Sequence, residues 1–174
     1  EKPAIIICNH QSHIDLMCTL MLSPKIVVLT NDWVWNNPFY GRIIKFAEFY
    51  PVSNGAEVSL PRMKDLMERG YSILVFPEGT RSADCSIGRF HKGAFYLANE
   101  LKADIVPLFI HGFGHVLPKN DFMLRPGSLF MQVDKRISYN DYKEICGPQY
   151  DAQQDRALTS YFGRYYRSHY KELC

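Results

Sequence analysis

The chain alternates short apolar runs with stretches of helical periodicity, and this alternation limits its possible folds more than any other feature. We predict strands at the runs rich in β-branched and other apolar residues: 4–8, 25–30, 71–76, 104–110 and 129–133. Several of these runs are apolar throughout, as is typical of strands buried on both faces of a sheet. Residues 49–53 are a further candidate, in which Pro51 indicates an edge or a bend.

Helical periodicity separates these strands. It covers residues 14–22, 39–47, 57–69 and 92–101, and a polar, Tyr-rich stretch at 150–173 is expected to form one helix or a pair. In 57–69 the apolar residues recur at helical spacing, and Gly70 supplies the stop. Strands that alternate with helices predict an α/β fold: a single layered domain over residues 1–174, with a mostly parallel, mixed β-sheet flanked by helices.

Composition narrows the class of partner. The net charge is only +2 and the cations are scattered, so nucleic acid is not an expected ligand. The five cysteines are odd in number and never form a Cys-x-x-Cys pair, which favours reduced thiols over a disulfide framework or a zinc–cysteine site. No apolar run reaches the roughly 18 residues that span a bilayer. Because the first strand begins after three residues, we expect a domain cut from a longer protein, which can contain further domains.

A polar segment follows the first predicted strand, at the edge of an α/β sheet where chemistry tends to lie. His10 stands on this turn, and Asp15 follows five residues later in the first turn of the next helix. The turn can fold the carboxylate back onto imidazole Nδ1–H, which leaves Nε2 as a general base. A substrate that brings its own hydroxyl then needs no protein nucleophile.

Other interpretations of this segment stay open on spacing alone. An Asp near a helix start is often a cap, and a lone His at a strand end is often only a hydrogen-bonded polar residue. His13 is the weaker catalytic candidate for the same reason. Cys8 and His10 share a strand face, but no further cluster at metal-ligand spacing completes a site, so no metal is expected.

A second polar segment follows the apolar strand at 71–76. Pro77 ends the strand, Gly79 permits close backbone approach, and Glu78 and Arg81 bring charge to the edge where His10 is expected. The planar guanidinium of Arg81 suits a phosphate or a carboxylate. An exposed turn with an ordinary salt bridge is the alternative.

Farther along, residues 89–94 (Arg-Phe-His-Lys-Gly-Ala) precede a predicted helix. Their cations can meet an anionic carrier such as coenzyme A or acyl carrier protein, although any one of them can also be solvated surface charge.

These segments together resemble the glycerolipid acyltransferase family, the acyl-glycerol-phosphate and glycerol-phosphate acyltransferases. The family's Asn-His-x-x-x-x-Asp motif stands at 9–15, its Phe-Pro-Glu-Gly-Thr-Arg-Ser motif at 76–82, and its Phe-x-Lys-Gly-Ala segment at 90–94. A later Val-Pro strand motif is similar to residues 105–108, continuing to 117–119. Order and spacing agree from Ile5 to about Ile137.

The resemblance implies an acyl-CoA or acyl carrier protein co-substrate, no cofactor, and a lipid-like acceptor. It makes His10 the base and Asp15 its partner. The residues expected to bind substrate are Asn9, Ser12, Glu78, Gly79, Thr80, Arg81, Lys92 and Gly93.

One departure concerns the acceptor. The family's second motif ends in an Arg that helps to hold the acceptor phosphate, and here Ser53 or Asn54 stands near that position. Loss of such a contact weakens phosphate selection. We therefore hypothesise an acceptor other than a standard glycerol phosphate, such as another lipid or a pigment-like hydroxyl compound.

Aromatic residues and cations crowd the segment between the second and third strands. We predict that Trp33, Trp35 and Tyr40 contact a membrane, because such residues suit the interface between lipid and water. A helix that packs on the sheet is the alternative. The expected location is the cytoplasmic face of a membrane, peripheral or tethered through parts of the protein outside this chain.

Two other functions are consistent with the same residues. A thioesterase or other hydrolase can use the same His–Asp pair to activate water, although no Gly-x-Ser-x-Gly nucleophile elbow is present. A non-catalytic module that binds lipid or acyl carrier is the third reading, and the intact His10 and Asp15 disfavour it.

Overall fold

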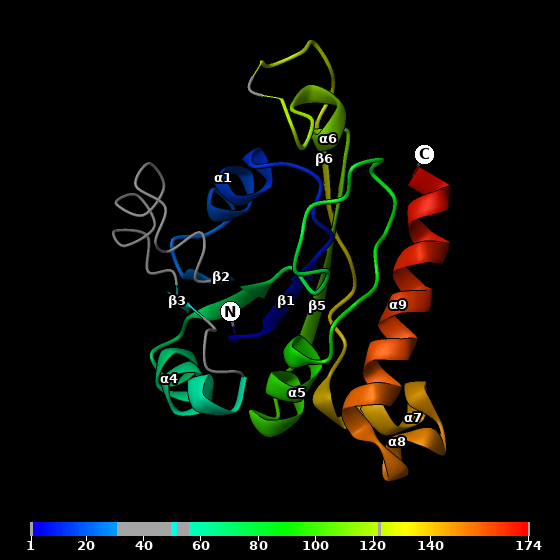
Figure 1. The fold of residues 1–174 in the computed structure, drawn as a ribbon. Coiled ribbons are helices and arrows are strands. Elements are labelled where there is room, and N and C mark those ends of the chain that lie inside the picture. The colour runs from blue at the N-terminus through cyan, green and yellow to red at the C-terminus, as the bar shows by residue number, and fades with distance from the viewer. Residues whose placement is uncertain (1, 31–49, 52–55, 122, 174) are drawn as a thin grey trace.

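The computed structural model describes residues 2–30, 50–51, 56–121 and 123–173 (Figure 1). Six strands form one sheet in the order β3-β2-β4-β1-β5-β6. Neighbours from β3 to β5 pair in parallel, and β6 pairs antiparallel to β5. The strands are β1 (Ile5–Cys8), β2 (Ile26–Thr30), β3 (Tyr50–Pro51), β4 (Ser72–Val75), β5 (Ile105–His111) and β6 (Phe130–Val133). The predicted mixed, mostly parallel sheet is confirmed.

The helices also follow the prediction closely. Helix α1 ends at Leu20 rather than at 22, and a turn leads from there towards Pro24, which cannot continue a helix. The short elements α6 (Phe113–Val116), η1 (Tyr139–Asp141) and α7 (Tyr142–Cys146) were not predicted, because three to five residues carry too little periodicity. The helix predicted at 39–47 lies outside the described residues. The helices are α1 (Ile14–Leu20), α4 (Ala56–Glu68), α5 (Gly93–Glu100), α6 (Phe113–Val116), α7 (Tyr142–Cys146), α8 (Gln149–Ala152) and α9 (Gln154–Leu173).

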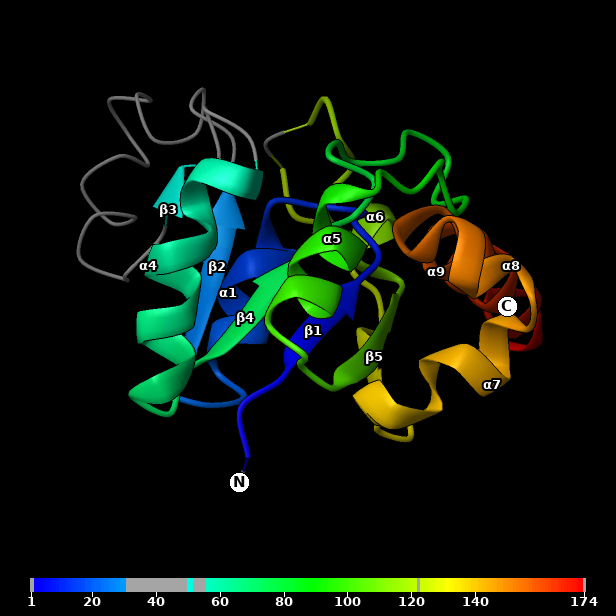
Figure 2. The ribbon, with the colours of Figure 1, turned by 90° about the horizontal axis from the view of Figure 1, so that it is seen from below.

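The two faces of the sheet are covered unequally. Figure 2, the view from below, shows α4, α5 and α9 in a row across one face. Alternate strand residues such as Ile5 and Ile7 join the main apolar core on that face, as the pleat requires. Cys8 and Val28 belong to a smaller cluster on the opposite face, against which α1 packs. Among the described helices, none is both long and apolar enough to cross a bilayer.

Helix α9 is fastened to the centre of the sheet by one tyrosine. Tyr166 is fully buried, its hydroxyl donates to the Ile7 carbonyl, and the Leu108 N–H donates to the same hydroxyl at 3.1 Å. Ile7 pairs with Pro107, which has no N–H for the strand ladder. The tyrosine therefore supplies a hydrogen-bonded bridge between β1 and β5 beside the proline. The bridge contacts Ile7, three residues before the catalytic candidate His10.

We expect Tyr166→Phe to lower the free energy of unfolding by about 1–3 kcal/mol, because it leaves buried strand groups without their partner. Chemical denaturation followed by circular dichroism measures this. Tyr161→Phe, on the same helix, is the matched control, because that side chain is only partly buried and should change stability little. Equal effects of the two substitutions would contradict the bridging role.

Candidate active site

His10 and Asp15 are in direct contact where β1 leads into α1. His10 Nδ1 lies 2.8 Å from Asp15 Oδ2, and the Asp15 side chain is fully buried whereas 21% of the His10 side chain is exposed. The imidazole ring stacks on Phe76, the residue that follows β4, with ring centroids 4.3 Å apart. With Nδ1 held by the carboxylate, Nε2 is the nitrogen left to exchange a proton with a substrate.

The Asp15 carboxylate also holds the turn that carries His10. The backbone N–H groups of Gln11 and Ser12 donate to the same oxygen, at 2.6 and 2.8 Å. Three donors on one oxygen stabilise a buried carboxylate, which would otherwise pay a large desolvation penalty. The predicted His–Asp contact is therefore present, and a carboxylate held in this way orients the ring through both the side chain and the backbone.

Glu78 fixes the other side of the His10 backbone. Its Oε1 accepts the His10 N–H at 2.9 Å, and its Oε2 accepts the Gly88 N–H at 2.7 Å. Glu78 is only 5% exposed, and burial raises the pKa of its carboxyl while the two N–H groups oppose that shift. A side chain at Gly88 would place its Cβ 2.7 Å from Oε2, so the close approach requires glycine.

The turn that holds Glu78 therefore touches the turn that holds His10. The Ser82 N–H also donates to the His10 carbonyl at 2.9 Å. Sequence reasoning placed Glu78 at the acceptor; in the structure its two oxygens contact backbone, and a role in substrate binding stays a prediction.

The rest of the Glu-Gly-Thr-Arg turn is tied to a loop that sequence reasoning did not assign to the site. Arg81 Nη1 donates to the Lys119 carbonyl at 2.8 Å, and Lys119 Nζ donates to the Arg81 carbonyl at 2.8 Å and to Thr80 Oγ1 at 3.4 Å. Gly79 has a φ of +67°, a conformation that other residues rarely adopt. Lys119 thus brings a second cation beside Arg81, which the sequence signals only through its Leu-Pro-Lys segment.

Asn9 and Ser12, predicted to bind substrate, are both buried and hydrogen-bonded to the protein. Asn9 exchanges two bonds of 2.9 Å with the backbone of Ile110, and so ties the end of β1 to β5. Ser12 Oγ donates to the Leu117 carbonyl at 2.7 Å. These contacts hold the rim of the site in shape, and substrate contact by either residue stays a prediction.

His13 lies at the same rim. Burial lowers the pKa of this histidine, and the positive charges of Arg81 and His10 lower it further. The hydrogen bond from the Ser82 N–H to the His10 carbonyl shows directly that the two polar segments lie together, as the sequence predicted.

Lys92 and Gly93 lie farther along, at the start of α5. Lys92 is the exposed N-cap residue and Gly93 begins the helix. The predicted membrane residues Trp33, Trp35 and Tyr40, and the positions of Ser53 and Asn54, lie outside the described residues.

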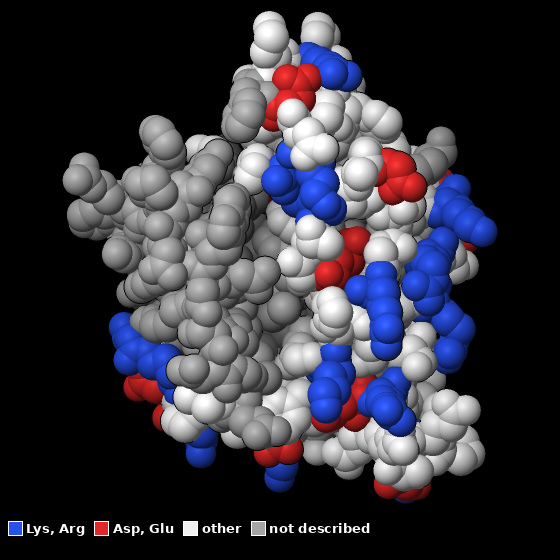
Figure 3. Space-filling view, in the orientation of Figure 1, with Lys and Arg blue, Asp and Glu red and all other residues white. Residues whose placement is uncertain are grey.

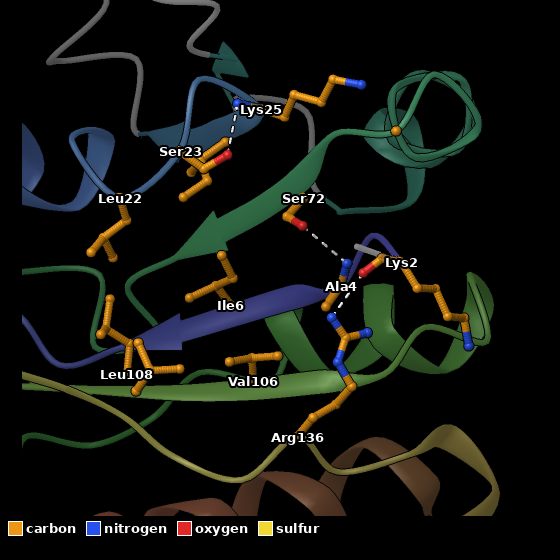
Figure 4. Close-up of a pocket in the computed structure, with 13 residues that line it drawn as sticks. Lys2, Ala4, Ile6, Leu22, Ser23, Lys25, Ser72, Val106, Leu108 and Arg136 are labelled. Atoms are coloured by element: carbon orange, nitrogen blue, oxygen red, sulfur yellow. Dashed lines mark hydrogen bonds between the residues drawn. The ribbon is translucent and has the colours of Figure 1, made fainter.

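A separate hollow of about 440 Å³ lies at the other end of the sheet (Figure 4). Ala4, Ile26 and Ser72, which line it, stand at the amino ends of the strands, opposite the carboxyl edge that carries His10. This hollow is therefore not part of the candidate site.

Cys8 is the last residue of β1, two positions before His10, and it is fully buried. Burial raises the pKa of the Cys8 thiol well above its ordinary value, which makes it a poor metal ligand or nucleophile. None of the four described cysteines forms a disulfide, and no three described His, Cys, Asp or Glu side chains group as metal ligands would.

Comparison with solved structures identifies a similar fold. The 1-acyl-sn-glycerophosphate (LPA) acyltransferase PlsC of Thermotoga maritima matches with a TM-score of 0.78 and 20% sequence identity, over 99% of this chain and 67% of that one. At this identity the likeness supports the fold alone.

Sequence comparison identifies relatives and the family. A 1-acyl-sn-glycerol-3-phosphate acyltransferase of Chlamydomonas reinhardtii is 30% identical over 80% of this chain and 44% of its own length, and a chloroplastic one of Arabidopsis thaliana is 28% identical over 84% and 42%. This chain thus spans less than half the length of these two curated relatives. The Acyltransferase family model matches residues 1–111, which hold both polar segments of the site. The chain therefore belongs to the Acyltransferase family.

Proposed function

We propose that this domain transfers a fatty acyl group from a thioester donor, acyl-CoA or acyl carrier protein, to a hydroxyl of a lipid-like acceptor. The contact between His10 Nδ1 and Asp15 Oδ2, 2.8 Å long at a partly exposed rim, carries this proposal. The relatives named as 1-acyl-sn-glycerol-3-phosphate acyltransferases support the glycerolipid class of acceptor. No cofactor is required, because the thioester itself supplies the activated acyl group.

His10 acts as the general base in the proposed reaction. Its Nε2 takes the proton of the acceptor hydroxyl as that oxygen attacks the thioester carbonyl. The tetrahedral intermediate then collapses, the carbon–sulfur bond breaks, and the imidazolium returns the proton to the departing thiolate. Asp15 holds the ring in the reactive tautomer and stabilises the imidazolium, as the Asp does in a serine-protease triad.

The cations Arg81 and Lys119 are suited to an anionic part of a substrate. They are linked to each other through their carbonyl groups at the same rim as His13, close to His10. Because the acceptor is lipid-like, we expect the domain to work at the cytoplasmic face of a membrane, peripheral or tethered through segments outside this chain.

His10→Ala and Asp15→Asn should each lower acyl transfer by at least about 100-fold, the loss expected when a general base or its orienting group is removed. Thiol release from acyl-CoA or acyl carrier protein, with and without acceptor, measures this. His115→Ala is the control, because that histidine is exposed. Release without acceptor would identify a thioesterase, and no release by the folded wild-type protein would identify a binding module.

Glu78→Gln should lower both the free energy of unfolding, by about 1–3 kcal/mol, and the turnover number. The amide of Gln has one acceptor oxygen, so its NH₂ group must face the N–H of either His10 or Gly88. Denaturation and steady-state kinetics measure the two effects. Glu100→Gln, an exposed position in α5, is the control and should match the wild-type protein. Wild-type turnover in the Glu78 variant would refute its positioning of His10.

The absence of Arg at Ser53 and Asn54 predicts weak selection for an acceptor phosphate. A lost charge-assisted hydrogen bond costs about 1.5–3 kcal/mol, or about 10- to 150-fold in rate. We therefore expect kcat/KM for lysophosphatidate to be within about tenfold of that for monoacylglycerol. The two acceptors should be compared in mixed micelles of equal composition. A preference for lysophosphatidate of 100-fold or more would overturn this hypothesis and place the acceptor with that of the relatives.

A further inference from the structure

A concave basic surface lies between the 89–92 segment and α9, and we call it the basic hollow. Its volume is about 620 Å³, which lies in the range of small-molecule sites. Figure 3 shows the Lys and Arg side chains that gather on this side of the molecule, where α9 runs in Figure 1. The lining residues are Arg89, Phe90, His91, Lys92, Arg156, Thr159, Ser160, Gly163 and Arg167.

The charged residues that line the basic hollow are all cations. Arg89, Lys92, Arg156 and Arg167 are exposed, and none of the described lining residues is acidic. None of these four cations takes part in a salt bridge with a described acid. Four like charges around one hollow repel one another, and an anionic ligand that enters it would remove that repulsion.

Helix α9 lines the basic hollow with residues along one of its faces. The lining positions 156, 159, 160, 163 and 167 recur at helical spacing. Phe162 and Tyr166, between them in sequence, are fully buried against the core and so fix which face α9 turns to the hollow. The exposed Ser160 adds a hydroxyl, whereas the Thr159 hydroxyl donates to the Asp155 carbonyl one turn earlier in α9. Gly163 leaves room because it has no side chain.

The basic hollow adjoins the candidate active site through His91. The His91 N–H donates to the Pro77 carbonyl at 2.7 Å, and a Cβ at Gly79 would lie 3.4 Å from the His91 ring. Glu78, between these two residues, holds the backbone of His10. A ligand can therefore have one end in the hollow and reach past the Glu-Gly-Thr-Arg turn towards the imidazole.

We propose that the basic hollow binds the phosphate-bearing nucleotide end of an acyl-CoA donor, whose thioester then reaches His10. This inference rests on the proposed function. The diphosphate and the 3′-phosphate of coenzyme A supply several negative charges within one small molecule, which suits four cations around a concave surface. An acidic carrier protein would need a broad complementary face, whereas the cations here surround a hollow.

Arg156→Gln combined with Arg167→Gln tests the site. The double variant should raise KM for acyl-CoA about tenfold with kcat nearly unchanged, because exposed charge pairs contribute less than buried ones. Acyl-dephospho-CoA should show a smaller loss, and acyl-N-acetylcysteamine, which carries no phosphate, should show none. Arg164→Gln is the matched control: it removes the same charge from an exposed position of α9, but Arg164 does not line the hollow.

Direct binding separates this inference from the proposed function. Calorimetry with an unreactive S-alkyl-CoA should give a wild-type Kd for His10→Ala and a Kd about tenfold weaker for the double variant. Wild-type affinity in the double variant would refute the hollow as the donor site and leave the role of His10 intact. An equal rise in KM for all three donors in the double variant would also refute it. So would a double variant that binds S-alkyl-CoA normally but has lost affinity only for acyl carrier protein, or only for vesicles of phosphatidylcholine and phosphatidylglycerol.

Discussion

The carboxylate of Asp15 is the interaction on which the site depends. One buried oxygen accepts from the His10 ring and from two successive backbone N–H groups, so ring and turn are held by a single charge. Glu78 completes the arrangement from the neighbouring strand, since its oxygens hold the backbone of His10 and of Gly88. Removal of either carboxylate would leave buried donors without partners. The contacts that orient His10 therefore also stabilise the turn that carries it.

The sheet brings these two carboxylates together because β1 and β4 are adjacent and parallel. Their carboxyl ends meet at one edge, where the segments after each strand must pack against each other. Asn9 ties the same edge to β5, and Tyr166 bridges β1 and β5 beside Pro107. The hydrogen-bonded centre of the sheet thus supports a site built on turns. Helix α9 packs against the core and also lines part of the basic hollow.

The pattern of apolar runs was sufficient to predict most of the fold. The strands at 4–8 and 71–76 appear within one residue at each end, because short apolar runs of this kind are typical of strands buried on both faces of a sheet. The short α6 and α7 were missed, since their four and five residues are fixed by contacts rather than by periodicity. The pattern of apolar runs also does not give the strand order, which depends on how the helices cover the two faces.

The sequence by itself determined the residues of the site: a histidine, a carboxylate five positions later, and a Glu-Gly-Thr-Arg turn after a buried strand. Only the tertiary structure decided their partners. It turned Glu78 inward to the His10 backbone, joined Lys119 to Arg81, and set four scattered cations around one hollow. Residues 89–92 and 156–167 are separated by more than sixty positions. No local pattern relates them, because their proximity arises from the packing of α9 against the sheet.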